Sequence, residues 1–278
     1  MQFQRVLIVG AGQMGGGIAQ VMAASGRSVS LHDTVPGAAE RALETMRGSL
    51  GKLVAKGADL DVDAVLARVE PADELSAADF MVEAVVEEAK VKEDVFRRVD
   101  EVLPPEAILA SNTSSIPISS LAGVTGRPDR VIGMHFFNPV PVMALVEIVR
   151  GRETSDDTVA AVTELARELG KTPAEANDFP GFVSNRILMP YINEAAHALE
   201  QGVAEPEAID TIAKLGFNHP MGPLALADLI GLDTCVAILE VLRDGLGDER
   251  YEPAGVLREH VAAGHLGRKS GRGFYDYA

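Results

Sequence analysis

The hydrophobic positions in the first two thirds of the chain form short runs that charged or small-residue segments separate. The runs lie at residues 5–9, 28–33, 80–86, 107–110, 131–134 and 145–149. Short apolar runs bounded by glycine or polar turns are typical of buried strands. Helices are expected between them at residues 14–25 and 90–103, and a further helix after them at residues 156–169. This alternation predicts an α/β fold with a mostly parallel sheet covered by helices.

The pattern changes after the segment Asp178-Phe179-Pro180-Gly181. From there the chain has the pattern of helices only, at residues 182–201, 206–215 and 224–246. We therefore expect an α/β domain over residues 1–181 and a smaller, all-α domain over residues 182–278. The segment 224–246 carries apolar residues on more than one helical face, so part of this surface is expected to meet another subunit.

Composition and charge narrow the class of protein. The chain has 278 residues, of which 47% are hydrophobic and 24% charged, as in an ordinary globular protein. Its net charge of −16 repels nucleic acid and anionic membrane surfaces, so we expect neither as a partner. The single cysteine, Cys235, excludes an internal disulfide and fits a reducing compartment. Neither a secretory leader nor an apolar run of about 18 residues is apparent, and we expect a cytoplasmic protein.

A glycine-rich loop follows the first apolar run. Its sequence is Gly10-Ala11-Gly12-Gln13-Met14-Gly15, between a strand and a helix. In that position the first glycine permits a tight turn, the second lets the backbone approach a pyrophosphate, and the third lets the helix pack on the strand. The helix N-terminus then faces the anion. This pattern predicts a Rossmann-type dinucleotide-binding domain.

The residue at the end of the second run indicates which dinucleotide would bind. Asp33 is placed to accept hydrogen bonds from a ribose diol, and Thr34 follows it. The charge of Asp33 would repel a 2′-phosphate, and no arginine stands directly beside it. We therefore expect NAD(H) rather than NADP(H), although a glycine-rich turn with a solvated aspartate is the alternative.

A basic segment interrupts this acidic sequence. Ser49, Lys52 and Lys56 are spaced to share one face of a helix that ends at Gly57. Such a face could hold phosphates, with lysine as the point charge and serine as a donor. A solvated helix face explains the same pattern equally well.

Polar residues that could carry chemistry follow the later strands. The run Ser111-Asn112-Thr113-Ser114-Ser115 comes after the apolar run 107–110, at the sheet edge where α/β proteins hold ligands. Its hydroxyl groups would face the cofactor. The same residues are also common in turns and at helix N-caps, which is the alternative.

His135 directly follows the apolar run 131–134, and Glu147 interrupts the apolar run 145–149. A carboxylate in such a strand is costly unless it is paired or hydrogen-bonded. A His–Glu pair would orient the imidazole and stabilise its protonated form, as acid/base catalysis of alcohol–ketone interconversion requires. The alternative is an edge strand with Glu147 in water and His135 packed in the core.

Other candidate sites give weaker signals. Asn185 lies at the start of the first helix of the second domain, where its amide could donate to a substrate carbonyl or form an interdomain hydrogen bond. Ser114 lacks the Gly-x-Ser-x-Gly context of a nucleophile, and Cys235 lies in an apolar segment. The spacing of the histidines, including His260 and His265, does not indicate a metal site.

Six ordered motifs, spread over nearly the whole chain, resemble those of the L-3-hydroxyacyl-CoA dehydrogenase family in its short form, typified by 3-hydroxybutyryl-CoA dehydrogenases. They begin with the glycine loop, extended through Gly16-Gly17-Ile18-Ala19. The others are Val82-Glu83-Ala84-Val85-Val86-Glu87 with Lys90-Val91-Lys92, Ala110-Ser111-Asn112-Thr113-Ser114-Ser115, Gly133-Met134-His135-Phe136-Phe137-Asn138-Pro139, Pro180-Gly181-Phe182-Val183-Ser184-Asn185-Arg186, and Gly267-Arg268-Lys269-Ser270-Gly271-Arg272-Gly273-Phe274-Tyr275.

The resemblance implies a role for each matching residue. His135 would be the general acid/base and Glu147 its partner, while Ser114 and Asn185 would bind the reacting oxygen and the thioester region. The positions that would line the nicotinamide half of the cofactor site are Glu87, Lys92, Asn138 and Lys269. Ser49 and Lys56 match positions that contact coenzyme A, and Lys52 lies on the same face. The family also implies a homodimer formed through the helical domain.

The resulting hypothesis is reversible hydride transfer between C3 of a 3-hydroxyacyl thioester and NAD. Two alternatives remain at this stage. One is an NAD-dependent dehydrogenase of a free hydroxy acid or sugar acid, which would not need Ser49 and Lys56. The other is a dinucleotide-binding structural protein without turnover.

Overall fold

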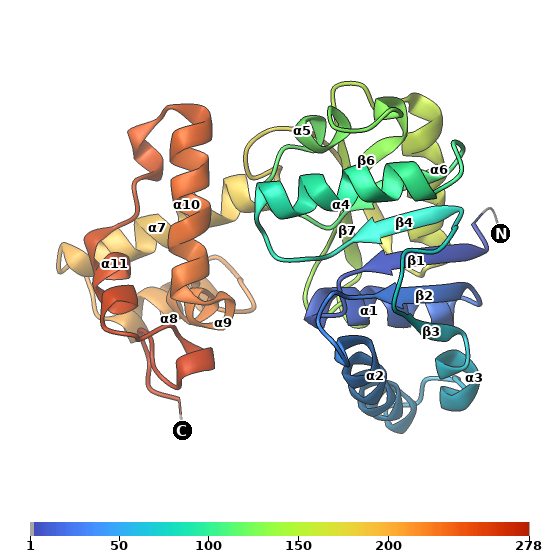
Figure 1. The fold of residues 1–278 in the computed structure, drawn as a ribbon. Helices are drawn as coiled ribbons and strands as arrows, with labels where there is room; N and C mark the ends of the chain where they lie inside the picture. Colours follow the sequence, from blue (N-terminus) through green and yellow to red (C-terminus); the bar gives the residue numbers. More distant parts are fainter. Residues whose placement is uncertain (1–2, 278) are drawn as a thin grey trace. The chain divides into compact units, whose positions relative to one another are not determined.

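The computed structural model describes residues 3–277. They form two compact units that divide between Phe179 and Pro180. The first unit is built on an eight-stranded sheet and the second consists of helices (Figure 1). The α/β class with a smaller helical part is therefore confirmed.

The sheet is parallel except at one pair of strands. Its order is β3-β2-β1-β4-β5-β6-β7-β8, and only β6 and β7 run antiparallel. Strands β1, β4 and β5 therefore end at the same edge, where the loops that follow them converge. The strands are β1 (Arg5–Val9), β2 (Ser28–His32), β3 (Val69–Ala72), β4 (Phe80–Glu83), β5 (Ile108–Ser111), β6 (Val131–Phe136), β7 (Leu145–Arg150) and β8 (Thr172–Asn177).

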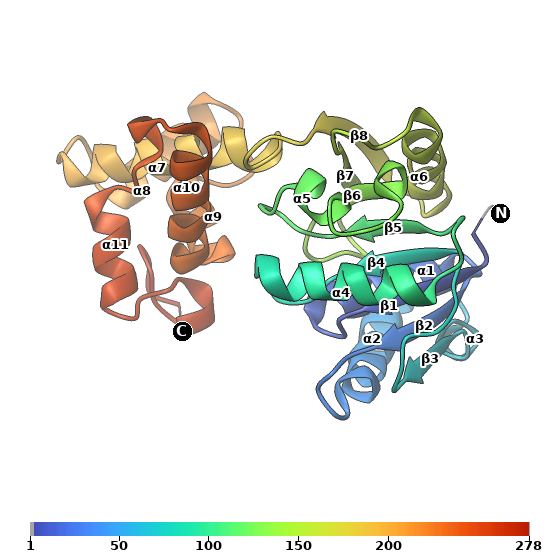
Figure 2. The same cartoon turned by 45° about the horizontal axis from the view of Figure 1, so that its top comes forward.

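Helices cover both faces of this sheet (Figure 2). On one face, Ile18 of α1, Met46 of α2 and Val162 of α6 pack with sheet residues such as Ile8 into one buried core. On the other face α4 and α5 lie against the strands. The helices of this unit are α1 (Gln13–Ala24), α2 (Ala38–Ala55), α3 (Val62–Leu66), α4 (Ala89–Val102), α5 (Ile118–Ala122), the 3-10 turn η1 (Pro128–Arg130) and α6 (Asp156–Glu168).

Two strand ends differ from the sequence-based expectation by two residues or more. The run 80–86 stops being a strand at Glu83, because its partner β1 ends at Val9, opposite Glu83. The run 131–134 continues as a strand to Phe136, because β7 pairs with it that far. His135 therefore lies inside a strand and not after one. The four-residue edge strand β3 was not predicted, since Glu70 and Pro71 interrupt its apolar pattern.

The second unit is a group of helices around its own core. Ile192 of α7, Leu239 of α10 and Leu257 of α11 are fully buried in that core. Its elements are α7 (Ser184–Glu200), α8 (Pro206–Gly216), α9 (Pro223–Ile230), α10 (Leu232–Leu246), η2 (Glu249–Tyr251), α11 (Gly255–Ala262) and η3 (Arg268–Ser270). Within residues 3–277, none of the helices has both the length and the apolar character needed to cross a membrane.

The prediction of a single helix over residues 224–246 is wrong. The chain forms α9 and α10 there, and Gly231 separates them with a φ of 108°. A residue with a Cβ atom rarely adopts this conformation. A Cβ at Gly231 would also lie 2.9 Å from Lys269 Nζ. An apolar pattern that continues through both helices does not reveal this break.

We expect Gly231→Ala to lower the free energy of unfolding by about 1–3 kcal/mol, because the substitution forces alanine into a backbone region suited to glycine. Urea denaturation followed by circular dichroism measures this change. The control is Gly216→Ala at the end of α8, where a Cβ would meet only Ile212, at 3.8 Å. Equal stability of the Gly231→Ala variant and the wild type would contradict the assignment of strain to this position.

Candidate active site

The glycine loop between β1 and α1 has the geometry of a phosphate-binding turn. Gly10 has a φ of 104°, and a Cβ there would lie 2.5 Å from the carbonyl oxygen of Ala84. A Cβ at Gly15 would lie 1.8 Å from the Gly10 carbonyl oxygen. Gly12 is the N-cap of α1, and nothing lies within 4 Å of where its Cβ would be. The first and third glycines are thus required by close packing, whereas the second leaves the helix N-terminus open to an anion.

Asp33 holds this loop to the end of β2. Its Oδ2 accepts a hydrogen bond from the Ala11 N–H at 2.7 Å, and its Oδ1 accepts one from the Val35 N–H at 2.8 Å. Asp33 and Gly12 line two cavities, one on each side of the loop. The Asp33 carboxylate is half-buried and is shared by the linings of the two cavities.

The smaller cavity has a volume of about 390 Å³ and lies between the strand ends and α4. Thr34 lines it beside Asp33, and Val91, Val95 and Arg98 of α4 form its opposite wall. The apolar side chains of Val91 and Val95, across the cavity from the Asp33 carboxylate, suit a flat heterocyclic ring.

The larger cavity, of about 570 Å³, lies against α2. Six of the residues expected at the site line it, namely Ala11, Gly12, Gln13, Asp33, Ser49 and Asn138. Met14 instead packs against the core of the sheet.

The basic face of α2 differs in part from the expectation. Ser49 lines the larger cavity, whereas Lys52 and Lys56 are exposed at the C-terminal end of the helix. The cavity is lined instead by Arg41 and Thr45, which lie two helical turns and one helical turn before Ser49, respectively. Neither residue was expected here, because both lie before Ser49, the first residue of the predicted basic face. The spacing of Arg41, Thr45 and Ser49, four residues apart, was the available signal.

The antiparallel pairing of β6 and β7 sets His135 directly opposite Glu147. His135 Nδ1 and Glu147 Oε2 are 2.9 Å apart, and the two residues are only 8% and 3% exposed. The Phe137 ring lies 4.8 Å from the imidazole, centroid to centroid. Because β8 continues the sheet beyond β7, Glu147 is not on an edge strand in water. The arrangement can orient a proton acceptor and compensate the positive charge that it gains.

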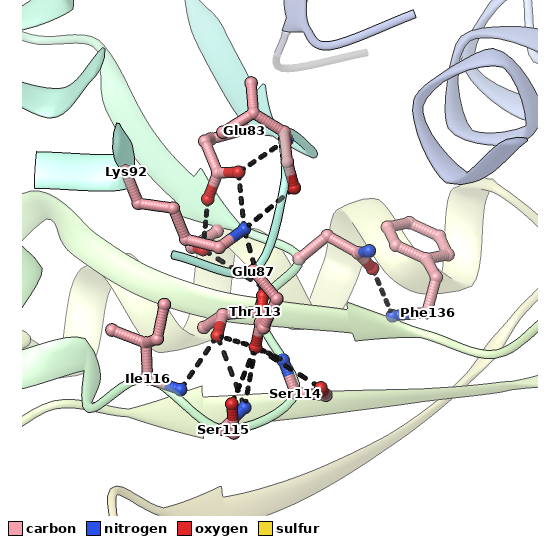
Figure 3. A network of polar contacts seen from close by, with 11 residues as sticks. Glu83, Glu87, Lys92, Thr113, Ser114, Ser115, Ile116 and Phe136 are labelled. Atoms are coloured by element: carbon pink, nitrogen blue, oxygen red, sulfur yellow. Dashed lines mark hydrogen bonds and ion pairs between the residues drawn. The ribbon is translucent and has the colours of Figure 1, made fainter. Parts of the chain in front are cut away.

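A second polar network joins the end of β4, helix α4 and the loop after β5 (Figure 3). The Lys92 ammonium is 1% exposed and lies 2.6 Å from Glu83 Oε1 and 3.2 Å from Glu87 Oε2. Glu83 Oε2 accepts a hydrogen bond from Ser111 Oγ at 2.6 Å. Lys92 is thus a buried counter-ion that holds two carboxylates in place.

Glu87 organises the loop that carries Ser114. Its Oε1 accepts hydrogen bonds from Thr113 Oγ1 at 2.6 Å and from the backbone N–H groups of Ser114 and Ser115 at 2.8 and 3.0 Å. Burial raises the pKa of Glu87, but the charge of Lys92 and these donors outweigh burial and lower the pKa overall. The carboxylate therefore stays ionised at neutral pH.

The remaining candidates lie in the second unit. Asn185 is buried in the first turn of α7. Lys269 lies in η3, with its Nζ 2.5 Å from Asp233 Oδ1. Cys235 is fully buried, and burial raises its pKa to about 12, so its thiol is not a nucleophile at neutral pH. Among residues 3–277, no cluster of His, Cys, Asp or Glu suited to a metal ion is present.

A Rossmann-type sheet with an open glycine loop and a buried His–Glu pair defines the class of nicotinamide-dependent oxidoreductases. Sequence comparison identifies the family. The model for "3-hydroxyacyl-CoA dehydrogenase, NAD binding domain" matches residues 5–179, and that for "3-hydroxyacyl-CoA dehydrogenase, C-terminal domain" matches residues 181–277. The chain belongs to the 3-hydroxyacyl-CoA dehydrogenase family, and the resemblance in its motifs is confirmed.

Full-length relatives share much of the sequence. A probable 3-hydroxybutyryl-CoA dehydrogenase of Deinococcus radiodurans is 58% identical, over 97% of this chain and 99% of that protein. The 3-hydroxybutyryl-CoA dehydrogenase of Bradyrhizobium diazoefficiens is 48% identical, over 99% and 95%. The crystal structure of (S)-3-hydroxybutyryl-CoA dehydrogenase from Ralstonia eutropha matches with a TM-score of 0.95 and 50% identity, covering 99% of both chains.

We expect Glu87→Gln to lower the free energy of unfolding at pH 7 by about 1 kcal/mol, a value reduced by the partial exposure of the carboxylate. Because the folded-state pKa of Glu87 is lowered, its stabilisation is complete above its ordinary pKa of 4.5 and is lost as the pH falls through the folded-state value. Urea denaturation between pH 7 and pH 3 should show the two proteins converging in acid.

The matched control for this measurement is Glu88→Gln, which removes the same charge from the exposed neighbouring residue. This control should show no pH-dependent difference of that size. A stability difference between Glu87→Gln and the wild type that stays constant from pH 7 to pH 3 would argue against an ionised, hydrogen-bonded Glu87.

Proposed function

We propose that this protein is an NAD-dependent dehydrogenase that interconverts (S)-3-hydroxyacyl-CoA and 3-oxoacyl-CoA, with 3-hydroxybutyryl-CoA and acetoacetyl-CoA as the substrate pair. The observation that carries the proposal is the buried His135–Glu147 contact, in the sheet of a chain that belongs to this family. The names of its full-length relatives support the choice of the four-carbon substrate.

In the proposed reaction His135 takes the proton of the 3-hydroxyl group as hydride leaves C3. Its Nδ1 faces Glu147, so Nε2 is the nitrogen that receives the proton. The Glu147 carboxylate then stabilises the imidazolium. Ser114 and Asn185 bind the reacting oxygen and the thioester region. In the reverse direction the same imidazolium returns its proton to the alkoxide.

The cofactor assignment rests on the glycine loop and Asp33. The bare backbone at Gly12 and the cavities on both sides of the loop fit a dinucleotide. NAD supplies the hydride acceptor when bound. Asp33 would bind the adenosine ribose, and its charge disfavours a 2′-phosphate. Glu87, Lys92, Asn138 and Lys269 are assigned to the nicotinamide half.

We assign coenzyme A to the side of the larger cavity that α2 forms, and the glycine-loop side of the same cavity to the dinucleotide. Ser49 and Arg41 line this cavity and offer a donor and a positive charge for phosphates. Lys52 and Lys56 extend the same positive field along the exposed end of the helix. In a protein of charge −16 such a local field is what attracts an anionic substrate.

The second domain, residues 182–278, is assigned to substrate binding and to a homodimer, beside a dinucleotide-binding domain over residues 1–181. Exposed apolar side chains on the helical unit support this interface, among them Ile212, Leu215 and Phe217, at 56%, 82% and 60% exposure. The single cysteine, Cys235, supports a reducing, cytoplasmic location.

The test is an NADH absorbance assay with acetoacetyl-CoA beside free acetoacetate. Turnover of the thioester alone supports the proposal, and turnover of the free acid favours a dehydrogenase of free hydroxy acids. Cofactor binding without turnover of a wider substrate panel favours a non-catalytic protein. Equal rates with NADPH would overturn the role of Asp33.

We expect Glu147→Gln to lower kcat by about a hundredfold or more, because the nearly isosteric amide cannot compensate the imidazolium. His135→Gln should cost at least as much. The double variant should lose far less than the product of the two effects, since the pair acts as a unit. Steady-state kinetics and NADH titration check this, and NADH affinity should change little. Near wild-type kcat in a folded Glu147→Gln variant would leave His135 as the sole acid/base group.

We expect Arg41→Ala to raise the KM for acetoacetyl-CoA about tenfold, because a charge-assisted contact to phosphate is lost. Lys56→Ala should raise this KM by less than Arg41→Ala does. The increase should be larger at low salt than at high salt, because salt screens the exposed ammonium group. The control is Arg47→Ala on the same helix, whose guanidinium pairs with Asp63 at 2.7 Å. An unchanged KM in Arg41→Ala and in the double variant of Lys52 and Lys56 would identify this helix face as merely solvated.

A further inference from the structure

The part of β6 that carries His135 extends beyond its neighbour β5. The last pair between these two strands is Ser111 with Gly133. His135 and Phe136 follow, and on their other side β7 continues to pair with them. On the β5 side, the regular hydrogen bonding of the sheet therefore ends before the residue that the proposed function makes the acid/base group.

Beyond the end of β5, the side chain of Asn112 forms a hydrogen bond with the backbone of β6 in place of a neighbouring strand. Its Oδ1 accepts a hydrogen bond from the backbone N–H of Phe136 at 2.9 Å. Figure 3 marks this hydrogen bond at the backbone nitrogen of Phe136. The residue immediately after His135 is thus held to the loop that immediately precedes Ser114.

Asn112 is itself held firmly. Its backbone N–H donates to the carbonyl oxygen of Glu83 at 2.9 Å, which continues the β4–β5 pairing by one residue. The Glu83 carboxylate binds Lys92 and the hydroxyl group of Ser111, the residue before Asn112. Glu83 and Lys92 are 0% and 1% exposed, so Asn112 is hydrogen-bonded to a residue of a fully buried ion pair.

We propose that Asn112 is a positioning residue, whose amide oxygen continues the sheet past the end of β5 and so fixes the His135 segment relative to Ser114. This inference rests on the proposed function, in which the side chains of His135 and Ser114 both contact the substrate and must therefore lie at a fixed distance from each other. A proton acceptor must sit within hydrogen-bond reach of the substrate hydroxyl, and a displacement of about 1 Å can cost about a hundredfold in rate.

The residue type fits this role. The contact needs a side-chain oxygen that accepts a hydrogen bond from one N–H and lies two carbon atoms from the backbone. Asparagine and aspartate both provide such an oxygen. The region already contains the carboxylates of Glu83, Glu87 and Glu147. A neutral amide provides the oxygen without a further negative charge there.

The experiment compares Asn112→Ala with Asn112→Asp, in assays with NADH and acetoacetyl-CoA. Alanine should lower kcat about 10- to 100-fold and leave the KM for NADH within about twofold. Aspartate keeps an acceptor oxygen but adds a negative charge, so it should recover at least about a third of the wild-type kcat without restoring all of it. In a His135→Gln background, Asn112→Ala should lower the residual rate by less than about threefold, because no base remains to be positioned.

The matched control is Asn193→Ala in the second unit. Asn193 Oδ1 also accepts a backbone hydrogen bond, from the Ala254 N–H at 2.8 Å, and the residue is 2% exposed. This variant should lose stability but keep kcat within about twofold at a temperature where it is folded.

A second readout does not depend on turnover. Hydrogen exchange at the Phe136 amide should speed up about tenfold or more in Asn112→Ala and stay near wild type in Asn112→Asp. Unchanged exchange at Phe136, a kcat within threefold of wild type in Asn112→Ala, or equal losses with and without His135 would each overturn the proposal. If the wild type does not reduce acetoacetyl-CoA, the proposed function fails, while the exchange at Phe136 still decides whether Asn112 holds the strand.

Discussion

The burial of charged side chains in and against the sheet is the constraint on which the rest of the first unit depends. Glu83, Lys92 and Glu147 are 0%, 1% and 3% exposed. Removing such groups from water costs several kcal/mol each unless opposite charges and hydrogen bonds compensate it. Glu83 therefore requires Lys92 from α4 and a hydroxyl from β5, and Glu147 requires His135 from β6. These requirements fix the ends of neighbouring elements relative to one another.

The reversal of chain direction at β7 has a specific consequence for the site. In a parallel pair the hydrogen bonds are slanted, whereas an antiparallel pair sets residues directly opposite each other. The register places His135 opposite Glu147, and a shift by one residue would turn one of the two side chains to the other face. The β6–β7 pairing therefore supports the His–Glu contact through backbone hydrogen bonds as well as through the side chains.

The two cavities share Asp33, and the charge around them differs from that of the protein as a whole. With a net charge of −16, the chain attracts anions only through local donors. The N-terminus of α1 and Arg41 supply such donors on the side of α2, and Arg98 supplies one on the side of α4. The positive groups suited to phosphate are thus a property of particular helix ends and faces and not of the overall composition.

The sequence by itself determined the α/β class, the glycine loop and the family, because apolar periodicity and short motifs depend on residues close together in the chain. It also singled out His135 and Glu147, since polar residues in apolar strands are conspicuous. Only the tertiary structure decided the break at Gly231, the extension of β6 to Phe136, and which residues of α2 line a cavity. The extension of β6 depends on β7, a partner distant in the sequence, and the other two depend on backbone angles and packing that apolar periodicity does not encode.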